Sequence, residues 1–189
     1  TSMAIWNDRT IIEYCNSSAL VTPFDAACVN PASIDLRLGA SYRLPAPMWQ
    51  SSGTRIAVAD PAHLATLPTW GDECTMPAEG VVIAPGQFIL CCSMETVRIP
   101  VDAAAFLMSK SSMGRGGLEH LHAGLGDPGF HGQWTWELHN VAPWPIALIP
   151  GKRYMQMVVY DLVEPPAHDY SVTGRYQNQQ GATPAREAR

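Results

Sequence analysis

Residues 127–140 read Asp-Pro-Gly-Phe-His-Gly-Gln-Trp-Thr-Trp-Glu-Leu-His-Asn. The opening Asp127-Pro128-Gly129 is typical of a tight turn, and the run that follows predicts a β-strand over 133–140. Glu137 interrupts that apolar run between Trp136 and Leu138. If the strand is central, the Glu137 carboxylate is withdrawn from water and suited to general acid–base catalysis. If the residue follows simple alternation, it faces solvent, and Asp127 could likewise be only a turn-capping residue.

Further short strands are predicted on both sides of this stretch. Apolar and polar residues alternate between Ile34 and Leu38, and the turn Ala84-Pro85-Gly86-Gln87 separates two apolar runs. A helix is predicted at 7–15, and the other predicted strands are 32–43, 81–83, 88–90, 106–108, 146–149 and 154–160. Many short strands between turns favour an all-β barrel or jelly roll.

The composition narrows the class of protein. Of 189 residues, 47% are hydrophobic but only 15% are charged, against about 25% in an average soluble domain. The chain is too apolar for disorder and has no apolar run of about 18 residues to span a membrane. Its net charge of −5, without a basic stripe, argues against a nucleic-acid partner. So little charge suggests that part of the surface is buried against copies of the chain.

The cysteines indicate a reduced protein. Cys15, Cys28, Cys74, Cys91 and Cys92 include no C-x-x-C pair, so neither a disulfide framework nor a cysteine zinc site is expected. No charged segment followed by an apolar one of the secretory type is seen. We therefore expect a cytoplasmic protein.

The chain is expected to fold as a single domain over 3–189. The stretch 45–77 is rich in Pro, Ser, Gly and Thr and predicts an insert or long arm. The end of the chain, 165–189, is polar and Gln-rich. It predicts either a disordered end or an arm that becomes ordered over a bound ligand.

The common catalytic motifs are missing from the sequence. It contains no P-loop, no dinucleotide-binding glycine fingerprint, no nucleophile elbow and no zinc-deaminase pattern. His120 and His122 would share one face of a strand and could bind a metal. No third ligand is evident, so a polar strand face or pocket wall is the simpler interpretation.

The segment Lys110-Ser111-Ser112-Met113-Gly114-Arg115 gathers two of the 12 basic residues around two hydroxyls and a glycine. Backbone N–H groups and hydroxyls donate hydrogen bonds to an anion, and the two cations neutralise its charge. The segment therefore suits an anionic ligand, and a solvated turn is the alternative.

Five motifs, in the same order along the chain, resemble those of the dCTP deaminase family within the dUTPase-like superfamily. The resemblance covers about residues 3 to 185, apart from 45–77. The motifs are 31–39; Ser-Ser-x-x-Arg-x-Gly-Leu at 111–118; Asp-Pro-Gly-Phe-x-Gly at 127–132 with Glu137 ten positions after Asp127; 150–152 with 154–156; and 176–182.

The resemblance implies a mainly β, distorted barrel or jelly roll of the dUTPase-like type with a few short helices. It also implies a homotrimer with active sites near the subunit interfaces. The implied reaction is a zinc-free, metal-independent hydrolysis of dCTP to dUTP and ammonia, with Mg²⁺ travelling on the triphosphate. Glu137 would be the general acid/base that takes a proton from the water attacking C4. Arg115 and Ser111 would orient Glu137, that water and the substrate.

The resemblance also implies a set of substrate contacts. Lys110 and Ser112 would contact the triphosphate, Asp127 would lie by the deoxyribose, and the backbone of 135–137 would read the base edge. The C-terminal arm would close over the nucleotide. The expected contacts are Lys110, Ser112, Met113, Gly114, Ala123, Asp127, Thr135, Trp136, Gln156, Tyr170, Arg175 and Gln179.

Three alternatives stay open. Asp127 and Glu137 together allow a bifunctional enzyme that also cleaves dUTP to dUMP and pyrophosphate, or a dUTPase alone. The third is a non-catalytic nucleotide-binding trimer. Lys110 stands where the family usually has Arg, which keeps the charge but loses the bidentate fork. Trp134 and Trp136 replace more usual aliphatic residues, so a modified pyrimidine is a further hypothesis for the base.

Overall fold

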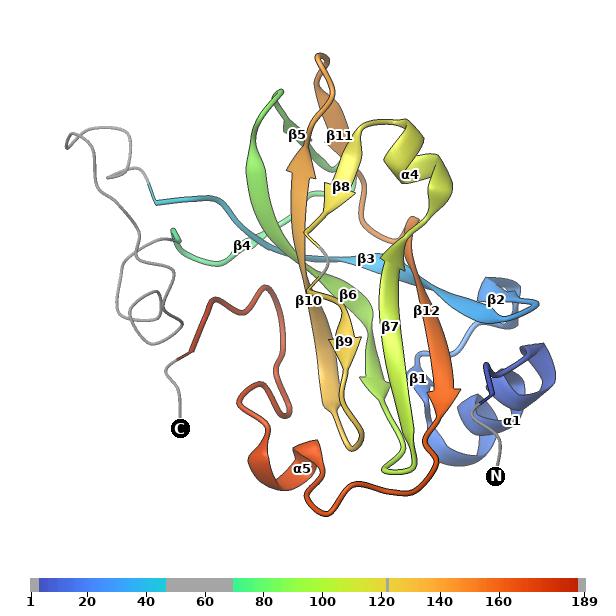
Figure 1. Cartoon of the computed structure of the whole chain (residues 1–189). Helices are drawn as coiled ribbons and strands as arrows, with labels where there is room; N and C mark the ends of the chain where they lie inside the picture. Colours follow the sequence, from blue (N-terminus) through green and yellow to red (C-terminus); the bar gives the residue numbers. More distant parts are fainter. Residues whose placement is uncertain (1–3, 47–69, 122, 187–189) are drawn as a thin grey trace.

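A computed structural model describes residues 4–46, 70–121 and 123–186 (Figure 1). His122, most of the predicted insert (47–69) and the last three residues of the predicted arm lie outside the described residues. In the described part, a curled antiparallel β-sheet forms the body of the molecule, and short helices lie at its periphery. The prediction of a mainly β fold with a few short helices is confirmed.

The main sheet of the described residues has ten strands, and its central path runs β8-β10-β6-β3-β12-β7-β9. β1, β2 and β4 are short additions to β6 or β3, and β5 pairs with β11 in a separate ribbon. The strands are β1 (Val21–Thr22), β2 (Val29–Asn30), β3 (Ser33–Arg43), β4 (Cys74–Thr75), β5 (Val81–Ile83), β6 (Phe88–Arg98), β7 (Ala103–Ser109), β8 (Leu118–His120), β9 (Leu125–Gly126), β10 (His131–Asn140), β11 (Ile146–Leu148) and β12 (Arg153–Asp161).

The curl of the sheet is carried by β3. Its first half pairs with β12, where Ile34 lies opposite Met157, and its second half pairs with β6, where Tyr42 lies opposite Cys91. The register shifts between Leu38 and Tyr42, as expected where a strand bends. β3 therefore crosses the molecule between the two groups of upright strands (Figure 1).

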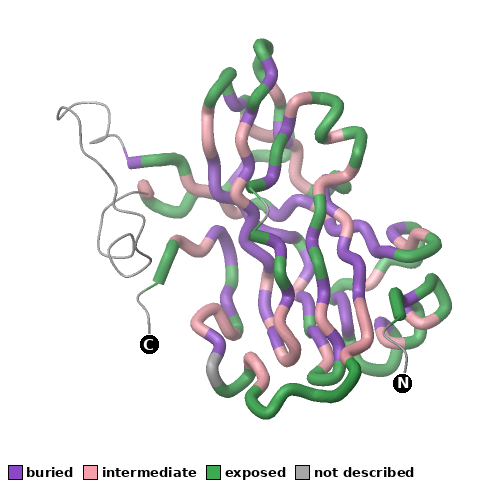
Figure 2. Tube along the Cα trace, viewed as in Figure 1, coloured by how far each residue is buried: buried purple, intermediate pink, exposed green. Residues whose placement is uncertain are grey.

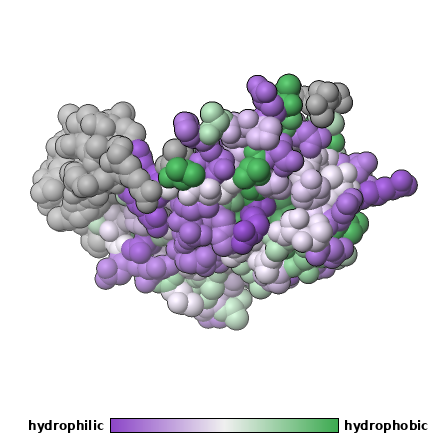
Figure 3. Space-filling model, turned by 90° about the horizontal axis from the view of Figure 1, so that it is seen from below, coloured by the Kyte–Doolittle hydropathy of each residue, from purple (hydrophilic) through white to green (hydrophobic). Residues whose placement is uncertain are grey.

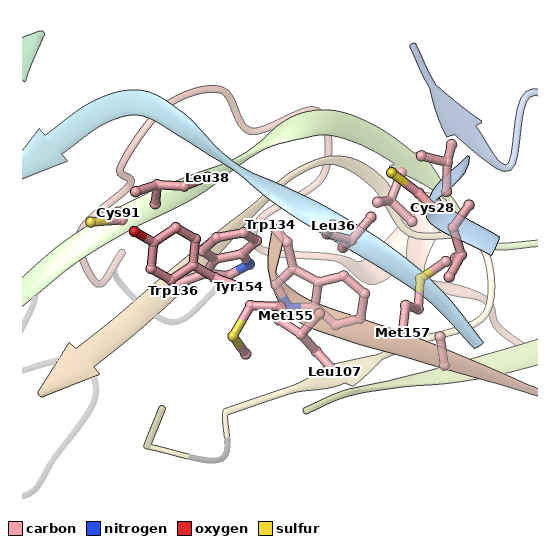
Figure 4. Packing of buried hydrophobic residues seen from close by; sticks show 14 of the residues in the cluster. Cys28, Leu36, Leu38, Cys91, Leu107, Trp134, Trp136, Tyr154, Met155 and Met157 are labelled. Carbon is pink, nitrogen blue, oxygen red and sulfur yellow. The ribbon is translucent and has the colours of Figure 1, made fainter. Parts of the chain in front are cut away.

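The core lies inside this curl and contains large side chains from several strands. Trp134, Trp136 and Leu138 of β10 are buried among Leu36, Leu38, Leu107, Tyr154 and Met155 (Figure 4). The middle stretches of the long strands are mostly buried, whereas the turns at their ends are largely exposed (Figure 2). The alternation along β10 thus gives it one face in the core and one face directed elsewhere.

The helices of the described residues are short. The predicted helix at 7–15 is confirmed as α1 (Asp8–Ser18), whose N-cap Asn7 accepts a hydrogen bond from Thr10 N–H at 3.1 Å. It extends to Ser18 because the chain turns only at Ala19, which adopts a left-handed conformation. The others are the 3₁₀ turn η1 (Ala26–Cys28), α4 (Ser111–Arg115) and α5 (Tyr170–Thr173).

The described end of the predicted insert contains a short strand of the sheet. β4 pairs with β3, where Ser41 lies opposite Thr75 and Tyr42 opposite Cys74. Strand pairing therefore resumes before Pro77, the end of the predicted insert.

The C-terminal tail (residues 170–186) follows the free edge of β10. Gln133 N–H donates to Gln179 C=O at 3.0 Å, and the Gln179 side-chain amide donates to Gln133 C=O at 2.8 Å. Further on, Ala182 N–H donates to Ser41 Oγ at 2.8 Å, and Arg43 Nε donates to Ala182 C=O at 2.8 Å. The predicted arm is thus ordered against its own chain from Tyr170 to Arg186.

The end of the molecule that carries α5 is largely hydrophilic, with small hydrophobic areas among polar side chains (Figure 3). Among the described residues, no helix is both long and apolar enough to cross a membrane.

Candidate active site

A cavity of about 340 Å³ lies between β10 and the C-terminal tail. Cavities of roughly 300–1,000 Å³ are typical of small-molecule sites. Its wall is mostly apolar, with six aromatic side chains, two carboxylates and a few uncharged polar groups. The lining residues are Trp70, Phe88, Leu90, Ala123, Leu125, Asp127, Phe130, Trp134, Thr135, Glu137, Tyr170, Tyr176, Gln179, Thr183 and Ala185.

Glu137 enters the cavity from the face of β10 that points away from the core. Its neighbours Trp136 and Leu138 are buried in the core, while Glu137 keeps 25% of its side chain exposed. The two alternatives for this residue are thus resolved in part, because it lies in a cavity rather than in the core or in open solvent. Its Oε2 is buried and lies 3.3 Å from Nε2 of His120.

Asp127 opens the turn that leads into β10. Phe130 N–H donates to Asp127 C=O at 3.0 Å, which closes the turn and leaves the carboxylate free to face the cavity. Partial burial raises the pKa of the Asp127 carboxyl above its ordinary value. The residue is therefore a lining residue of the cavity as well as a turn residue.

The edge of β10 is open in the middle of the site. β8 ends at His120, and the next residue, Leu121, donates its N–H to Glu137 C=O at 3.1 Å. The tail joins the same edge of β10 at Gln133. Because backbone groups alternate in direction along a strand, the N–H and C=O of Thr135 face the same edge. Thr135 Oγ1 also accepts a hydrogen bond from Thr183 N–H at 3.3 Å. A ligand in the cavity can therefore meet the backbone at 135.

The packing of the aromatic side chains in the cavity wall depends on Gly126. A Cβ at Gly126 would lie 2.7 Å from the Trp134 ring, so only glycine leaves room for this indole. Phe130 packs between Trp134 and Tyr170, with ring centroids 5.8 Å and 5.7 Å away. Trp134 therefore belongs to both the core and the cavity wall.

The tail supplies the outer wall of the cavity. Tyr170 begins α5, and its hydroxyl accepts a hydrogen bond from Tyr176 N–H at 3.2 Å. Burial is the main factor that raises the pKa of the Tyr170 phenol. Gln179 is held by its bonds to Gln133. Of the predicted contacts, the structure brings together Ala123, Asp127, Thr135, Glu137, Tyr170 and Gln179.

The segment predicted to bind an anion does not line this cavity. Ser111, Ser112, Met113, Gly114 and Arg115 form α4, which follows β7 at another part of the sheet (Figure 1). Lys110 precedes it, and its Nζ lies 2.6 Å and 2.7 Å from the two carboxylate oxygens of Asp35. Within one chain, therefore, the predicted phosphate-binding and acid–base residues occupy separate places.

Three other predicted contacts also lie elsewhere. The Trp136 side chain is fully buried in the core, so only its backbone can reach a ligand (Figure 4). Gln156 lies on β12, opposite Met108 of β7. The Arg175 guanidinium donates to Arg186 C=O at 3.3 Å within the tail.

Several lining residues were not singled out from the sequence as ligand contacts. Trp70 and Phe88, whose ring centroids are 5.1 Å apart, close one side of the cavity. Tyr176 belongs to a motif that the sequence did highlight, so its contact with the site was foreseeable. His120, which the sequence predicts as a polar strand or pocket-wall residue rather than a metal ligand, lies beside Glu137. Among the described residues, no group of three or more His, Cys, Asp or Glu could hold a metal ion.

Comparison with known proteins identifies the family. The family model described as dCTP deaminase-like matches residues 5–162. A protein of Mycobacterium ulcerans (strain Agy99) named "dCTP deaminase, dUMP-forming" is 39% identical over 176 residues, or 88% of this chain and 86% of that protein. A protein of the same name from Mycolicibacterium vanbaalenii is 41% identical over 190 residues, or 95% of this chain and 94% of that one.

The fold has a counterpart among solved structures. The 2'-deoxycytidine 5'-triphosphate deaminase of Agrobacterium tumefaciens superimposes with a TM-score of 0.65 at 24% identity. The match covers 85% of this chain but only 49% of the solved one, so this chain spans about half the length of that relative. At this identity the likeness concerns the fold. Because the family model and the mycobacterial relatives each span most of the sequence, the chain belongs to the dCTP deaminase-like family.

Proposed function

We propose that this protein hydrolyses dCTP to dUMP in two successive steps, a deamination and the release of pyrophosphate. The observation that carries the proposal is that two carboxylates, Glu137 and Asp127, line one mostly apolar cavity with several aromatic side chains. The mycobacterial relatives, at 38–41% identity, are named as dUMP-forming enzymes. They do not support the dUTP product that the sequence favoured, and the bifunctional alternative takes its place.

The first step is the replacement of the 4-amino group by oxygen. The pyrimidine lies against the aromatic wall with its edge toward the backbone at 135. Glu137 takes a proton from a water molecule, whose oxygen adds to C4. The protonated carboxyl then returns this proton to the amino group, the C4–N bond breaks, and ammonia leaves. The proton left on the C4 oxygen moves to N3, which gives the uracil ring. A carboxylate thus activates water without help from a protein-bound metal.

The second step uses the other carboxylate. Asp127 takes a proton from a second water molecule, whose oxygen attacks the α-phosphorus of dUTP. The bond from that phosphorus to the β-bridging oxygen breaks, and pyrophosphate leaves dUMP in the site. Mg²⁺ enters as part of the substrate, bound to its phosphate oxygens. The sum is dCTP plus two waters giving dUMP, pyrophosphate and ammonia.

The site is completed by another copy of the chain. Phe106 and Met108 of β7 and Leu125 of β9 form an exposed apolar face, and Phe106 lies opposite Leu125 in the register. Exposed apolar patches of this kind mark protein interfaces. Leu125 also lines the cavity, so a copy seated on this face lies beside the site. In the proposed homotrimer, α4 of one chain serves the cavity of the next.

The test is to incubate the protein with dCTP and Mg²⁺ and to separate dUTP, dUMP, pyrophosphate and ammonia over time. Wild type is expected to release dUMP, pyrophosphate and ammonia in equal amounts. Glu137→Gln should bind dCTP but lose about 10²–10⁴-fold in ammonia release, the usual contribution of a general acid/base. Asp127→Asn should accumulate dUTP.

Two results would contradict these assignments. A wild-type reaction that stops at dUTP would refute the dUMP product, and a Glu137→Gln variant that deaminates at the wild-type rate would refute the role of that carboxylate. Nucleotide binding without any turnover would point to the non-catalytic alternative. Feeding dUTP alone separates the second step from the first.

A further inference from the structure

Three buried side-chain polar atoms of the described residues have no hydrogen-bond partner: His120 Nε2, Trp136 Nε1 and Glu137 Oε2. Buried polar groups of folded proteins are nearly always paired, so each exception needs a reason. Two of these three atoms face each other, since His120 Nε2 and Glu137 Oε2 are 3.3 Å apart. The imidazole and the carboxylate are therefore one small rearrangement away from a hydrogen bond.

The fold holds His120 next to Glu137. His120 is the last residue of β8 and lies opposite Leu138 of β10, one residue from Glu137. The next residue, Leu121, still donates its N–H to Glu137 C=O at 3.1 Å. The His120 side chain is only 2% exposed, so it has little freedom to turn to water instead.

We propose that His120 is a positioning residue for Glu137, donating from Nε2–H to Oε2 of the carboxylate when nucleotide is bound. The inference rests on the proposed function, because it assigns a partner to the proposed acid/base. With Oε2 held on the buried side, Oε1 is directed into the cavity, where water and C4 meet. His120 itself does not touch the substrate.

The expected benefit is orientation. A carboxylate on a flexible side chain accepts a proton along many directions, and only one of them suits the attacking water. A donor fixed in the core restricts the carboxylate to that direction before the reaction begins. Misplacement of a reacting group by about 1 Å can cost on the order of 10²-fold in rate. His120 should therefore affect kcat far more than substrate binding.

The test compares variants at 120 with a matched histidine on the neighbouring strand. His120→Phe keeps an aromatic ring of similar size but removes the N–H, whereas His120→Gln keeps a side-chain donor. His139→Phe is the control, because His139 lies on β10 opposite Glu119 and Phe88 and does not line the cavity. Thermal unfolding of each variant reports whether the fold is kept.

The expected result is a split between kcat and KM. His120→Phe should lower kcat for dCTP deamination about 10- to 100-fold with KM little changed, consistent with loss of orientation. His120→Gln should restore part of the rate, and His139→Phe should behave as wild type. Equal kcat in wild type and His120→Phe would overturn the inference, and so would equal loss in His120→Phe and His120→Gln.

A crystal structure with bound nucleotide tests the contact independently of turnover. In the wild type, His120 Nε2 should lie within hydrogen-bond distance of Glu137 Oε2, and in His120→Phe the carboxylate should rotate or become disordered. A Glu137 carboxylate in the same position in both structures would overturn the inference. If wild type binds nucleotide with this contact but releases no ammonia, the proposed function fails while the assigned contact stands.

Discussion

Asp127 and Glu137 line the same cavity, but they are supported differently. Glu137 is carried by the central strand β10 and has an imidazole 3.3 Å from its buried oxygen. Asp127 is carried by a turn, and no charged partner contributes to the shift of its pKa, which burial alone raises. Two carboxylates in unlike surroundings can take unlike roles in one site, such as the two water activations proposed here.

Because the Asp127 carboxyl is partly buried, replacing it is predicted to raise the free energy of unfolding. Because its pKa is raised above 3.8 in the folded protein, the folded state binds the proton more tightly than the unfolded chain does. Its contribution to the free energy of unfolding therefore falls as the pH rises through this pKa. Asp127→Asn should unfold at higher urea concentration than wild type at pH 7, and the difference should narrow as the pH is lowered toward 3.8.

Asp169 provides the control of opposite sign. Hydrogen bonds from Ser171 lower the pKa of Asp169, so its carboxylate stabilises the fold above its ordinary pKa and this contribution is lost as the pH falls. Asp169→Asn should therefore lower the urea midpoint at pH 7. A lower midpoint for Asp127→Asn as well would contradict the assignment of a burial cost to Asp127.

Lys110 has a structural partner that its sequence context did not reveal. The Asp35 carboxylate is 2% exposed and accepts from Lys110 at 2.6 Å and 2.7 Å and from Asn30 at 2.9 Å. A second cation lies farther away, since Arg153 Nη1 is 3.7 Å from Asp35 Oδ2, so removing Lys110 leaves the buried carboxylate only partly compensated. Lys110→Met, which keeps most of the stem, should lower the free energy of unfolding by about 2 kcal/mol, the cost of lost hydrogen bonds to a charged group.

The matched control for Lys110 is Lys152→Met, on an exposed turn residue, which should change stability by less than about 0.5 kcal/mol. Chemical denaturation and the KM for dCTP are measured on both variants. If Lys110→Met raised KM without any loss of stability, Lys110 would serve the triphosphate rather than Asp35.

At the scale of elements, the sequence patterns predict where strands and turns lie better than they predict which strands pair. The sequence predicts the turn at 127–129 and the strand after it correctly, because Asp-Pro-Gly and β-favouring residues act over a few positions. The partner of β5 was not predictable, because it pairs with β11, more than sixty residues away, rather than with the adjacent β6. Likewise, the ion pair between Asp35 and Lys110 joins positions 75 residues apart.

The site was predictable to the extent that its residues belong to one stretch. Asp127, Thr135 and Glu137 come from the turn and strand quoted from the sequence, and they meet in the cavity. Trp70 and Phe88 are apolar residues that any core could use, so nothing in the sequence marks them as lining a cavity. The course of the tail depends on contacts with Ser41 and Arg43 that only the folded chain brings together.

The tail is fastened by a small cluster that we call the latch: Ser41, Arg43, Glu73 and Gly181. Gly181 has a φ of +67°, and its N–H donates to Gln133 Oε1 at 2.7 Å. A Cβ at this position would lie 2.0 Å from Glu73 Oε1 and 2.9 Å from Ser41 Oγ. Arg43 also pairs with Glu73 at 3.5 Å. A side chain at 181 must therefore displace the half-exposed Glu73 carboxylate and disturb the contacts that hold the tail at the latch.

Gly181→Ala is predicted to loosen the tail and weaken nucleotide binding. The KM for dCTP should rise about tenfold, corresponding to 1.4 kcal/mol of lost binding free energy, and the tail should exchange its amide hydrogens faster. Gly151→Ala is the matched control, since Gly151 has a φ of +78° but no atom within 4 Å of its added Cβ. It bears the same backbone strain without the clash. Equal effects of the two variants would show that strain, not the latch, is responsible.

At the scale of the whole molecule, the low charge of the sequence corresponds to an exposed apolar face. Only 15% of the residues are charged, and apolar side chains gather on the outer face of β7 and β9. Phe106 is 46% exposed, Met108 42% and Leu125 55%. A chain that left this face in water would expose a continuous apolar patch, which monomers usually avoid. The separation of α4 from the cavity within one chain has the same explanation if another copy supplies it.

The last prediction is that this face assembles the active enzyme. Light scattering should give the mass of three 20.6 kDa chains for wild type and of one chain for Phe106→Asp, because a buried, unpaired carboxylate opposes association. The same variant should lose deaminase activity, although Phe106 does not line the cavity. Val82→Asp, at an exposed position on β5, should stay trimeric and active. Mixing Phe106→Asp with an excess of Glu137→Gln should not restore activity. Mixing Arg115→Ala with Glu137→Gln should restore it, because the proposed trimer would pair α4 of one chain with the cavity of another. A fully active monomer would contradict both the trimer and its shared sites.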